Sequence, residues 1–337
     1  MNDTSPSIAT KRQPVADKAP WSLADFVLRW ESILVLLLIA VVIGNTWRSP
    51  YFLDIYNLSD ATQNFAEKAI VALPMALLIL VREIDLSVAA IIALASLMTG
   101  LAAQAGVPAP LLFLVGPLVG MACGLFNGTL VTRIGLPSIV VTIGTMSLFR
   151  GIAQVVLGDQ VIATYPSGYT DYGQSYLIKW PPLYLSFIIF LVLAVVFALV
   201  LHRTAFGRKL YAIGNNPVAA RFSGIPVERI RFWLFVLTGL LAGLAAALLT
   251  ARIGSTRPNI ALGWELEIIT MVILGGVSIA GGSGTIHGVM LAVFIIGLII
   301  FGLSLLNVPG IVISVLLGTL LILSLAAPLL LRRLLRR

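Results

Sequence analysis

The chain is poor in the side chains from which most active sites are built. Its 337 residues include a single cysteine, Cys123, and two histidines, His202 and His287. One cysteine excludes a disulfide framework and a thiolate metal site, and two distant histidines leave little for imidazole chemistry. We therefore expect no catalytic residue, no metal and no cofactor, and a chain that is not an enzyme.

Charge is scarce as well, since only 11% of the residues are charged and 59% are hydrophobic. A soluble globular protein carries about 25% charged residues, so this composition indicates a polytopic membrane protein. The net charge of +8 would suit nucleic acid only if it were clustered on a soluble face. Here the basic residues stand at the ends of apolar segments, so we expect a lipid bilayer and no nucleic acid as partner.

Apolar runs of spanning length recur along the chain, and each crossing needs about 20 residues. They lie near residues 32–47, 60–81, 87–105, 111–130, 138–157, 183–201, 232–251, 266–280, 288–305 and 309–331. The sequence thus predicts an all-α polytopic membrane protein with about ten transmembrane helices, of which the eighth is short enough to be partly re-entrant.

Basic residues orient these helices, because loops rich in Lys and Arg stay in the cytoplasm. We expect cytoplasmic N and C termini, a cytoplasmic tail at 1–30, a transmembrane domain at 31–331 and a basic cytoplasmic end at 332–337. The cationic segment 202–231 is then cytoplasmic, and the aromatic loop 158–182 is periplasmic. That loop is either a cap over the outer mouth or a plain aromatic belt.

Glycines recur every four residues in two of the predicted helices. Small residues at this spacing let helix backbones approach closely in lipid, where burial of apolar surface does not drive association. We expect helix-packing seams at Gly116, Gly120, Gly124 and Gly128, and at Gly239 and Gly243.

The cationic segment 202–231 contains signals for a short helix. Asn216 can cap the free amides of a helix that begins at Pro217, and Ser223-Gly224 ends it. A short helix with small side chains between two rigid turns can be gripped by another protein. The alternative is an ordinary basic surface loop.

Polar residues inside the predicted spans are candidates for a transport pathway, because a charge at the centre of a span costs roughly 2.5–3.5 kcal/mol. Asp60, Asn64 and Lys68 share one helix face, and Lys68 either pairs with Asp60 or Glu67 or lines a polar passage. Arg150 either snorkels outward or faces a cavity. The junction near residue 85 is either a capped turn or part of a gate. The pathway or gate candidates are Asn64, Lys68, Asp85, Ser87, Thr145 and Arg150.

The glycine-rich stretch 274–288, LGGVSIAGGSGTIHG, contains no lysine. A P-loop needs Gly-Lys-Ser/Thr to hold phosphate and magnesium, so we interpret this stretch as a tight turn. No ATP site is visible in the sequence, and an ATPase that drives transport would have to be another polypeptide.

Several motifs carry a resemblance when they are taken together and in order. They are Ile84-Asp85-Leu86-Ser87-Val88, Phe126-Asn127-Gly128, Ile143-Gly144-Thr145-Met146 with Arg150-Gly151, Phe206-Gly207-Arg208, Ala212 to Pro217, Ala219 to Ile225, and the turn 274–284. From residue 30 onward the chain resembles the inner-membrane permeases of ribose/arabinose/xylose-type sugar ABC importers. Within that family, Leu157 to Gln160 and the outer loop look closest to permeases for rhamnose or autoinducer-2.

This resemblance implies a bacterial inner-membrane permease that works with three kinds of partner: a double-cassette ATPase, a second permease that is homologous or identical, and a periplasmic sugar-binding protein. It makes the short helix the ATPase-coupling helix, and it leaves Arg252 and Arg257 as candidates for docking the binding protein. The rival reading is an ion-coupled secondary sugar transporter, which needs acids at mid-membrane flanked by discontinuous helices. The coupling residues are Gly214, Asn215, Asn216, Pro217, Ala219, Ala220, Arg221, Ser223 and Gly224.

The chain departs from the family at one point. The family usually has two glycines before the Ile-Asp-Leu-Ser string, whereas this sequence has Arg82 and Glu83. The departure puts a gate role for the junction in doubt, and it is compatible with one half of a heterodimeric permease.

Overall fold

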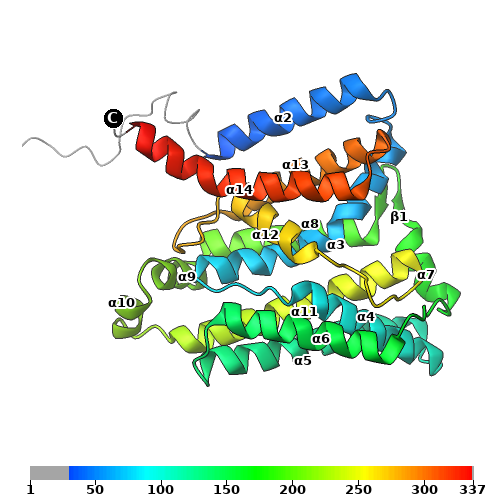
Figure 1. Ribbon diagram of the computed structural model, residues 1–337, viewed down its shortest axis with the longest axis horizontal. Coiled ribbons are helices and arrows are strands. Elements are labelled where there is room, and N and C mark those ends of the chain that lie inside the picture. Colours follow the sequence, from blue (N-terminus) through cyan, green and yellow to red (C-terminus); the bar gives the residue numbers. More distant parts are fainter. Residues whose placement is uncertain (1–29, 336–337) are drawn as a thin grey trace, which may run out of the picture.

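The computed structural model describes residues 30–335, and helices make up most of it. They are α2 (Trp30–Arg48), α3 (Ile55–Leu80), α4 (Val88–Gln104), α5 (Ala109–Thr132), α6 (Ser138–Leu157), α7 (Ser167–Gln174), α8 (Leu185–Arg203), α9 (Ala205–Asn215), α10 (Pro217–Phe222), α11 (Val227–Ile253), α12 (Trp264–Leu274), α13 (Ile286–Leu305) and α14 (Gly310–Leu335). The long helices run side by side along the molecule, with α10 at one end and α7 at the other (Figure 1). Apart from Trp30, the expected tail 1–30 lies outside the described residues, as do residues 336–337 of the expected basic end.

Seven of the described helices are long and apolar enough to cross a membrane: α2, α3, α5, α6, α8, α11 and α13. Helix α4 and the first part of α14, Gly310–Ser324, are apolar but shorter, and α12 has only 11 residues. Helices therefore lie at all ten positions where the sequence predicts spans, but three of them fall short of spanning length by this measure. The number of crossings, and the side on which each end lies, stay predictions.

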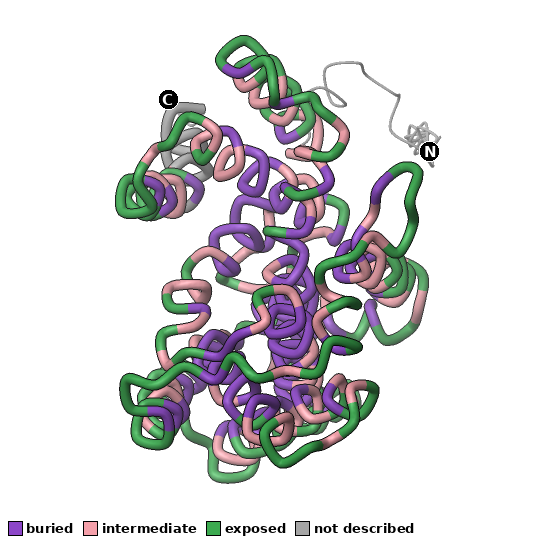
Figure 2. Tube along the Cα trace, turned by 90° about the vertical axis from the view of Figure 1, so that its right-hand side faces the viewer, coloured by how far each residue is buried: buried purple, intermediate pink, exposed green. Residues whose placement is uncertain are grey.

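The core of the bundle is formed by α3 and α11. Every residue of α3 from Ala69 to Leu80 is buried, and Figure 2 shows the buried trace running through the middle with exposed segments around it. Helix α11 packs on α5 through glycines. A Cβ added to Gly120 would lie 2.1 Å from the carbonyl oxygen of Gly239, and one added to Gly243 would lie 2.1 Å from that of Gly116. The two predicted glycine stripes are thus confirmed as one packing seam.

The loop between α6 and α8 contains regular structure that the all-α prediction missed. Strand β1 (Tyr176–Lys179) pairs antiparallel with β2 (Pro182–Tyr184). Tyrosine, leucine and isoleucine favour extended backbone, and the rings of Tyr176 and Tyr184 lie 4.6 Å apart across the hairpin. Tyr169 of α7 is fully buried, and its hydroxyl donates to the carbonyl of Ala247 at 2.6 Å. The loop is therefore packed onto the bundle at this point.

Candidate functional site

Helix α10 forms as the sequence predicts. The Asn216 side-chain oxygen accepts from the amides of Val218 and Ala219 at 3.1 and 3.0 Å, Pro217 occupies the first helical position, and Gly224 follows the helix with φ +80°. Of the two small residues in this helix, Ala219 is exposed and Ala220 is buried. Ala220 is only 4% exposed, so it faces the rest of the protein.

The apolar residues that α10 presents outward are Val218 and Phe222, which are 60% and 90% exposed. They are four residues apart and therefore share one helix face. The sequence analysis did not select them, although their spacing in an otherwise polar segment was a usable signal. They make α10 a helix with an exposed apolar face, held at the tip of the molecule (Figure 1).

The segment that carries α10 is seated on the glycine-rich turn. Gly214, near the end of α9, approaches α3 so closely that a Cβ would lie 2.0 Å from the carbonyl oxygen of Leu80. The amide of Gly282 donates to that same carbonyl at 2.9 Å, and the Tyr211 hydroxyl donates to the carbonyl of Gly284 at 2.7 Å. The stretch 274–288 therefore acts as a close-packed turn, with Gly281 and Gly282 at positive φ.

Arg82 stands where the family usually has a glycine, and the backbone keeps the conformation that glycine favours. Its φ is +68°, in the left-handed region that few other residues adopt. The guanidinium donates through Nε to the carbonyl of Gly214 at 2.7 Å and through Nη2 to that of Asn215 at 2.8 Å. The last carbonyls of a helix lack partners within the helix, and here Arg82 supplies them. These bonds offset the backbone strain of the positive φ at Arg82, and they fasten the end of α9 to the α3–α4 junction.

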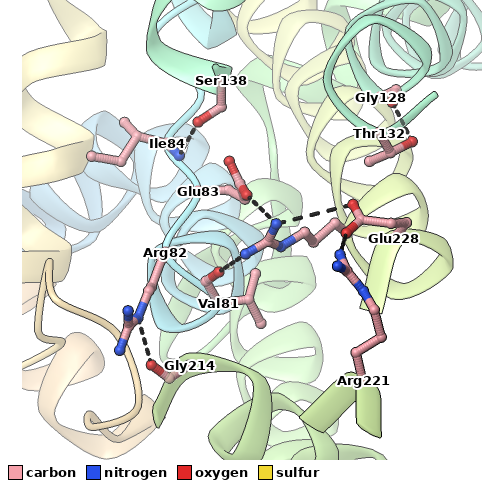
Figure 3. A network of polar contacts seen from close by, with 11 residues as sticks. Val81, Arg82, Glu83, Ile84, Gly128, Thr132, Ser138, Gly214, Arg221 and Glu228 are labelled. Atoms are coloured by element: carbon pink, nitrogen blue, oxygen red, sulfur yellow. Dashed lines mark hydrogen bonds and ion pairs between the residues drawn. The ribbon is translucent and has the colours of Figure 1, made fainter. Parts of the chain in front are cut away.

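A chain of charged side chains connects α10 to the same junction (Figure 3). Arg221 of α10 pairs with Glu228, and Arg231 lies 4.0 Å from Glu228 and 3.1 Å from Glu83. Burial raises the pKa of Glu83 above its ordinary value, although a hydrogen bond from Ser138 and the charge of Arg231 act in the opposite direction. A pair whose desolvation outweighs its attraction adds little net stability, so we assign this chain of charges a positioning role.

Asp85 and Ser87 belong to a buried polar cluster with Asn127 of α5. Asp85 Oδ1 accepts from the amide and the hydroxyl of Ser87 at 2.8 and 2.6 Å, and Asn127 donates to the Ser87 hydroxyl at 2.8 Å. Ser87 precedes α4 without a side-chain capping bond to that helix. Within residues 30–335, Asp85 Oδ2 and Asn127 Oδ1 lack hydrogen-bond partners, and burial raises the pKa of Asp85. The cluster links the start of α4 to the C-terminal part of α5.

Lys68 pairs with neither of the acids offered by its own helix. Its ammonium contacts Glu267 of α12 at 2.5 Å, whereas Asp60 accepts from the hydroxyl of Tyr184 at 2.7 Å. The expected Lys68 pair with Asp60 or Glu67 is therefore replaced by a pair across helices. Lys68 pairs with Glu267 because α12 starts next to the middle of α3. Sequence spacing alone does not reveal this proximity.

Arg252, expected as a docking residue, has internal partners. Its Nε donates to the fully buried carboxylate of Glu67 at 2.8 Å, and its Nη1 donates to the side-chain oxygen of Asn64 at 2.9 Å. Arg257 is exposed and lines a cavity of about 500 Å³ together with Asp159 and Asn259. Of the two arginines, Arg257 is the one available to a partner.

Arg150 braces the non-helical segment 254–263 between α11 and α12. It donates to the carbonyls of Pro258 and Ile260 at 3.1 and 2.6 Å, and to that of Ala89 at 3.2 Å. Irregular backbone at membrane depth is tolerated only where its polar groups find partners inside the protein. Thr145 is buried and bonds within α6 only. The structure thus gives Arg150 backbone partners that the sequence analysis did not anticipate, and its pathway role stays a prediction.

A cavity of about 330 Å³ collects part of the predicted pathway. Asn64, Lys68 and Arg252 line it, and Trp264 of α12 contributes an aromatic wall that the sequence analysis missed. The candidates Asp85, Ser87, Thr145 and Arg150 lie outside this lining. The predicted set is thus divided among three places: the α3–α4 junction with Asp85 and Ser87, helix α6 with Thr145 and Arg150, and this cavity near the start of α12 with Asn64 and Lys68.

Comparisons with known proteins identify the family of the chain. The family model described as branched-chain amino acid transport system / permease component matches residues 58–325. The chain is 37% identical over 300 residues to the autoinducer 2 import system permease protein LsrD of Yersinia enterocolitica, which covers 87% of this chain and 90% of the relative. It is 37% identical over 299 residues to LsrD of Escherichia coli K12 and of Shigella flexneri, with the same coverage.

No solved structure matches this chain. The family match covers most of the sequence, and the relatives are matched over nearly their full length. The helices long and apolar enough to cross a bilayer fit a multi-pass membrane protein. The chain belongs to the family of membrane permeases that serve sugar ABC import systems.

Proposed function

We propose that the chain is the non-catalytic permease subunit of an ATP-driven importer, and that α10 is the helix through which a separate ATPase moves it. The observation that carries this proposal is the exposed apolar face of α10, formed by Val218 and Phe222, on a helix tied to the bundle at several points. Single exposed apolar residues are common, but two that adjoin on one face of a helix at the tip of the molecule form a patch that a partner protein can cover.

The contacts behind α10 supply a route for movement. Arg221, Glu228, Arg231 and Glu83 connect α10 to the α3–α4 junction, and Arg82 holds the end of α9 to the same place. Displacement of α10 by a partner would therefore act directly on the ends of α3 and α4. Helix α3 is the most buried of the described helices, so its displacement reaches the centre of the bundle.

The remaining assignments follow from this role. The chain crosses the bacterial inner membrane about ten times with both termini in the cytoplasm, pairs with a second permease, and receives its cargo from a periplasmic binding protein. The cargo is a small hydroxylated molecule, either autoinducer-2, which the relatives import according to their names, or a rhamnose-like deoxysugar. The ion-coupled alternative would use the acids Glu67 and Glu267 beside the non-helical segment 254–263, but both acids are paired with cations, Arg252 and Lys68, which argues against it.

Phe222→Asp is expected to weaken binding of the partner ATPase. A central aromatic anchor is worth about 2 kcal/mol or more, which corresponds to roughly thirtyfold in Kd. Binding of the purified ATPase to the permease in lipid nanodiscs measures the effect. Ile134→Asp is the matched control, because Ile134 is 62% exposed and precedes α6 at the same end of the bundle. Equal binding by wild type and Phe222→Asp would remove α10 from the interface.

A further inference from the structure

The cavity near the start of α12 has the composition of a small-molecule site. Residues of α3, α11, α12 and α13 enclose it, and its volume of about 330 Å³ lies at the lower end of the range of roughly 300–1,000 Å³ for such sites. A non-helical segment leads into it, because residues 254–263 return from the α7 end and α12 begins only at Trp264, well inside the molecule (Figure 1). The cavity is therefore built where the helical framework is interrupted.

The charges around the cavity cancel. Lys68 and Arg252 line it, and each is held by one acid, Glu267 and Glu67, at 2.5 and 2.8 Å. Glu67 is fully buried and the other three side chains are at most 19% exposed, so each acid holds and neutralises its lining cation from behind the cavity wall. A site with two cations and two anions offers no net attraction to an anionic or a cationic ligand. It offers directed hydrogen-bonding groups to an uncharged one.

Aromatic and amide groups complete the lining. The ammonium of Lys68 lies 4.8 Å from the centroid of the Trp264 ring, and Phe65 and Phe301 supply further apolar surface. Asn64 uses its side-chain oxygen to accept from Arg252, and within residues 30–335 its amide nitrogen has no bond. Aromatic faces pack against C–H groups, while amide and guanidinium groups bond to hydroxyls.

We propose that this cavity is a recognition subsite within the permease for an uncharged, polyhydroxylated ligand, with Trp264 and Asn64 as its contact residues and the two ion pairs as its walls. The subsite deepens the proposed import function and rests on it. It predicts that the permease itself discriminates between a neutral sugar and its phosphate, in addition to any selection by a binding protein. Lys68 lines this cavity and Glu267 lines a second one, between α12 and α14, so the Lys68–Glu267 pair stands between the two spaces.

Protection of an introduced cysteine tests this subsite. Cys123→Ala gives a chain without cysteine, and Ser304→Cys then places one thiol in the cavity lining. The full-length permease in lipid nanodiscs is labelled with a hydrophilic methanethiosulfonate in the presence of L-rhamnose, D-ribose, unphosphorylated autoinducer-2 or ribose 5-phosphate. Ser167→Cys in the same background reports labelling at an exposed position of α7 away from the cavity.

We expect at least one neutral ligand to slow labelling of Ser304→Cys about tenfold when its concentration is ten times its Kd, and the phosphate to have no effect. Trp264→Leu and Asn64→Leu should each abolish protection while the rate without ligand changes less than about twofold. Failure of Ser304→Cys to react, absence of protection by any neutral ligand, or equal protection by the phosphate would overturn the proposal. The assay contains no ATPase, so its outcome is independent of the α10 interface.

Discussion

Gly120→Val is expected to prevent the permease from assembling its core. A Cβ at Gly120 would lie 2.1 Å from the carbonyl oxygen of Gly239 and 2.7 Å from the amide nitrogen of Gly243. Both contacts are with backbone, so no side chain can turn aside, and α5 and α11 would have to separate along their length. Overpacking costs about 1–3 kcal/mol where side chains can adjust, and we expect more than about 3 kcal/mol here. The measurement is the yield of monodisperse protein in detergent and its thermal midpoint.

Gly144→Val provides the matched control. Gly144 lies inside helix α6, and a Cβ added there meets nothing within 4 Å. The same substitution therefore adds the same atoms in the same kind of helix without a clash. Equal yields and midpoints for the two variants would contradict the close approach of α5 and α11.

The second large effect is expected at the buried acid beside the cavity. Arg252→Met removes the only ion-pair partner that Glu67 has within residues 30–335, and Glu67 is fully buried. Leaving one charge of a buried pair uncompensated costs about 3–5 kcal/mol. We expect a corresponding fall in the unfolding midpoint of the purified permease in detergent.

A double variant separates the lost pair from lost packing. Adding Glu67→Gln to Arg252→Met removes the orphaned charge and should restore most of the stability, because replacing both members of a buried pair is often nearly neutral. Arg221→Met is the control for an exposed pair, since its side chain is 62% exposed, and we expect a change below about 1 kcal/mol. If Arg252→Met lowers the unfolding midpoint no more than Arg221→Met does, the charge of Glu67 is compensated by another group, and this account of the pair is wrong.

Features set by neighbouring residues could be predicted from the sequence. Asn216 and Pro217 define the start of α10 because capping involves atoms two or three positions away. The glycine stripes predicted a packing face on each of α5 and α11, because a four-residue spacing is itself the geometry of a helix face, but not that the two faces meet. The glycine-rich stretch 274–288 was likewise predicted to form a tight turn, and Gly281 and Gly282 adopt positive φ there.

Features set by long-range contacts could not be predicted in this way. The spacing of Asn64 and Lys68 placed them on one face of α3. Their partners Arg252 and Glu267 lie 188 and 199 positions further along the sequence. Ala220 looked like a contact residue because it is small, yet its orientation is fixed by the packing of α9 and α11 around α10. Trp264 acquires meaning only from the position of α12, which begins inside the bundle after a non-helical segment.

The central claim is that an external ATPase drives import through α10, and uptake by the complete transporter tests it most directly. The permease is reconstituted in liposomes with its partner ATPase, second permease and binding protein, and accumulation of labelled autoinducer-2 and L-rhamnose is followed. The account predicts uptake of one of these ligands that requires ATP hydrolysis in wild type and is lost in Phe222→Asp. Uptake by the permease without ATP, driven by an imposed proton or sodium gradient, would contradict it and favour the ion-coupled alternative.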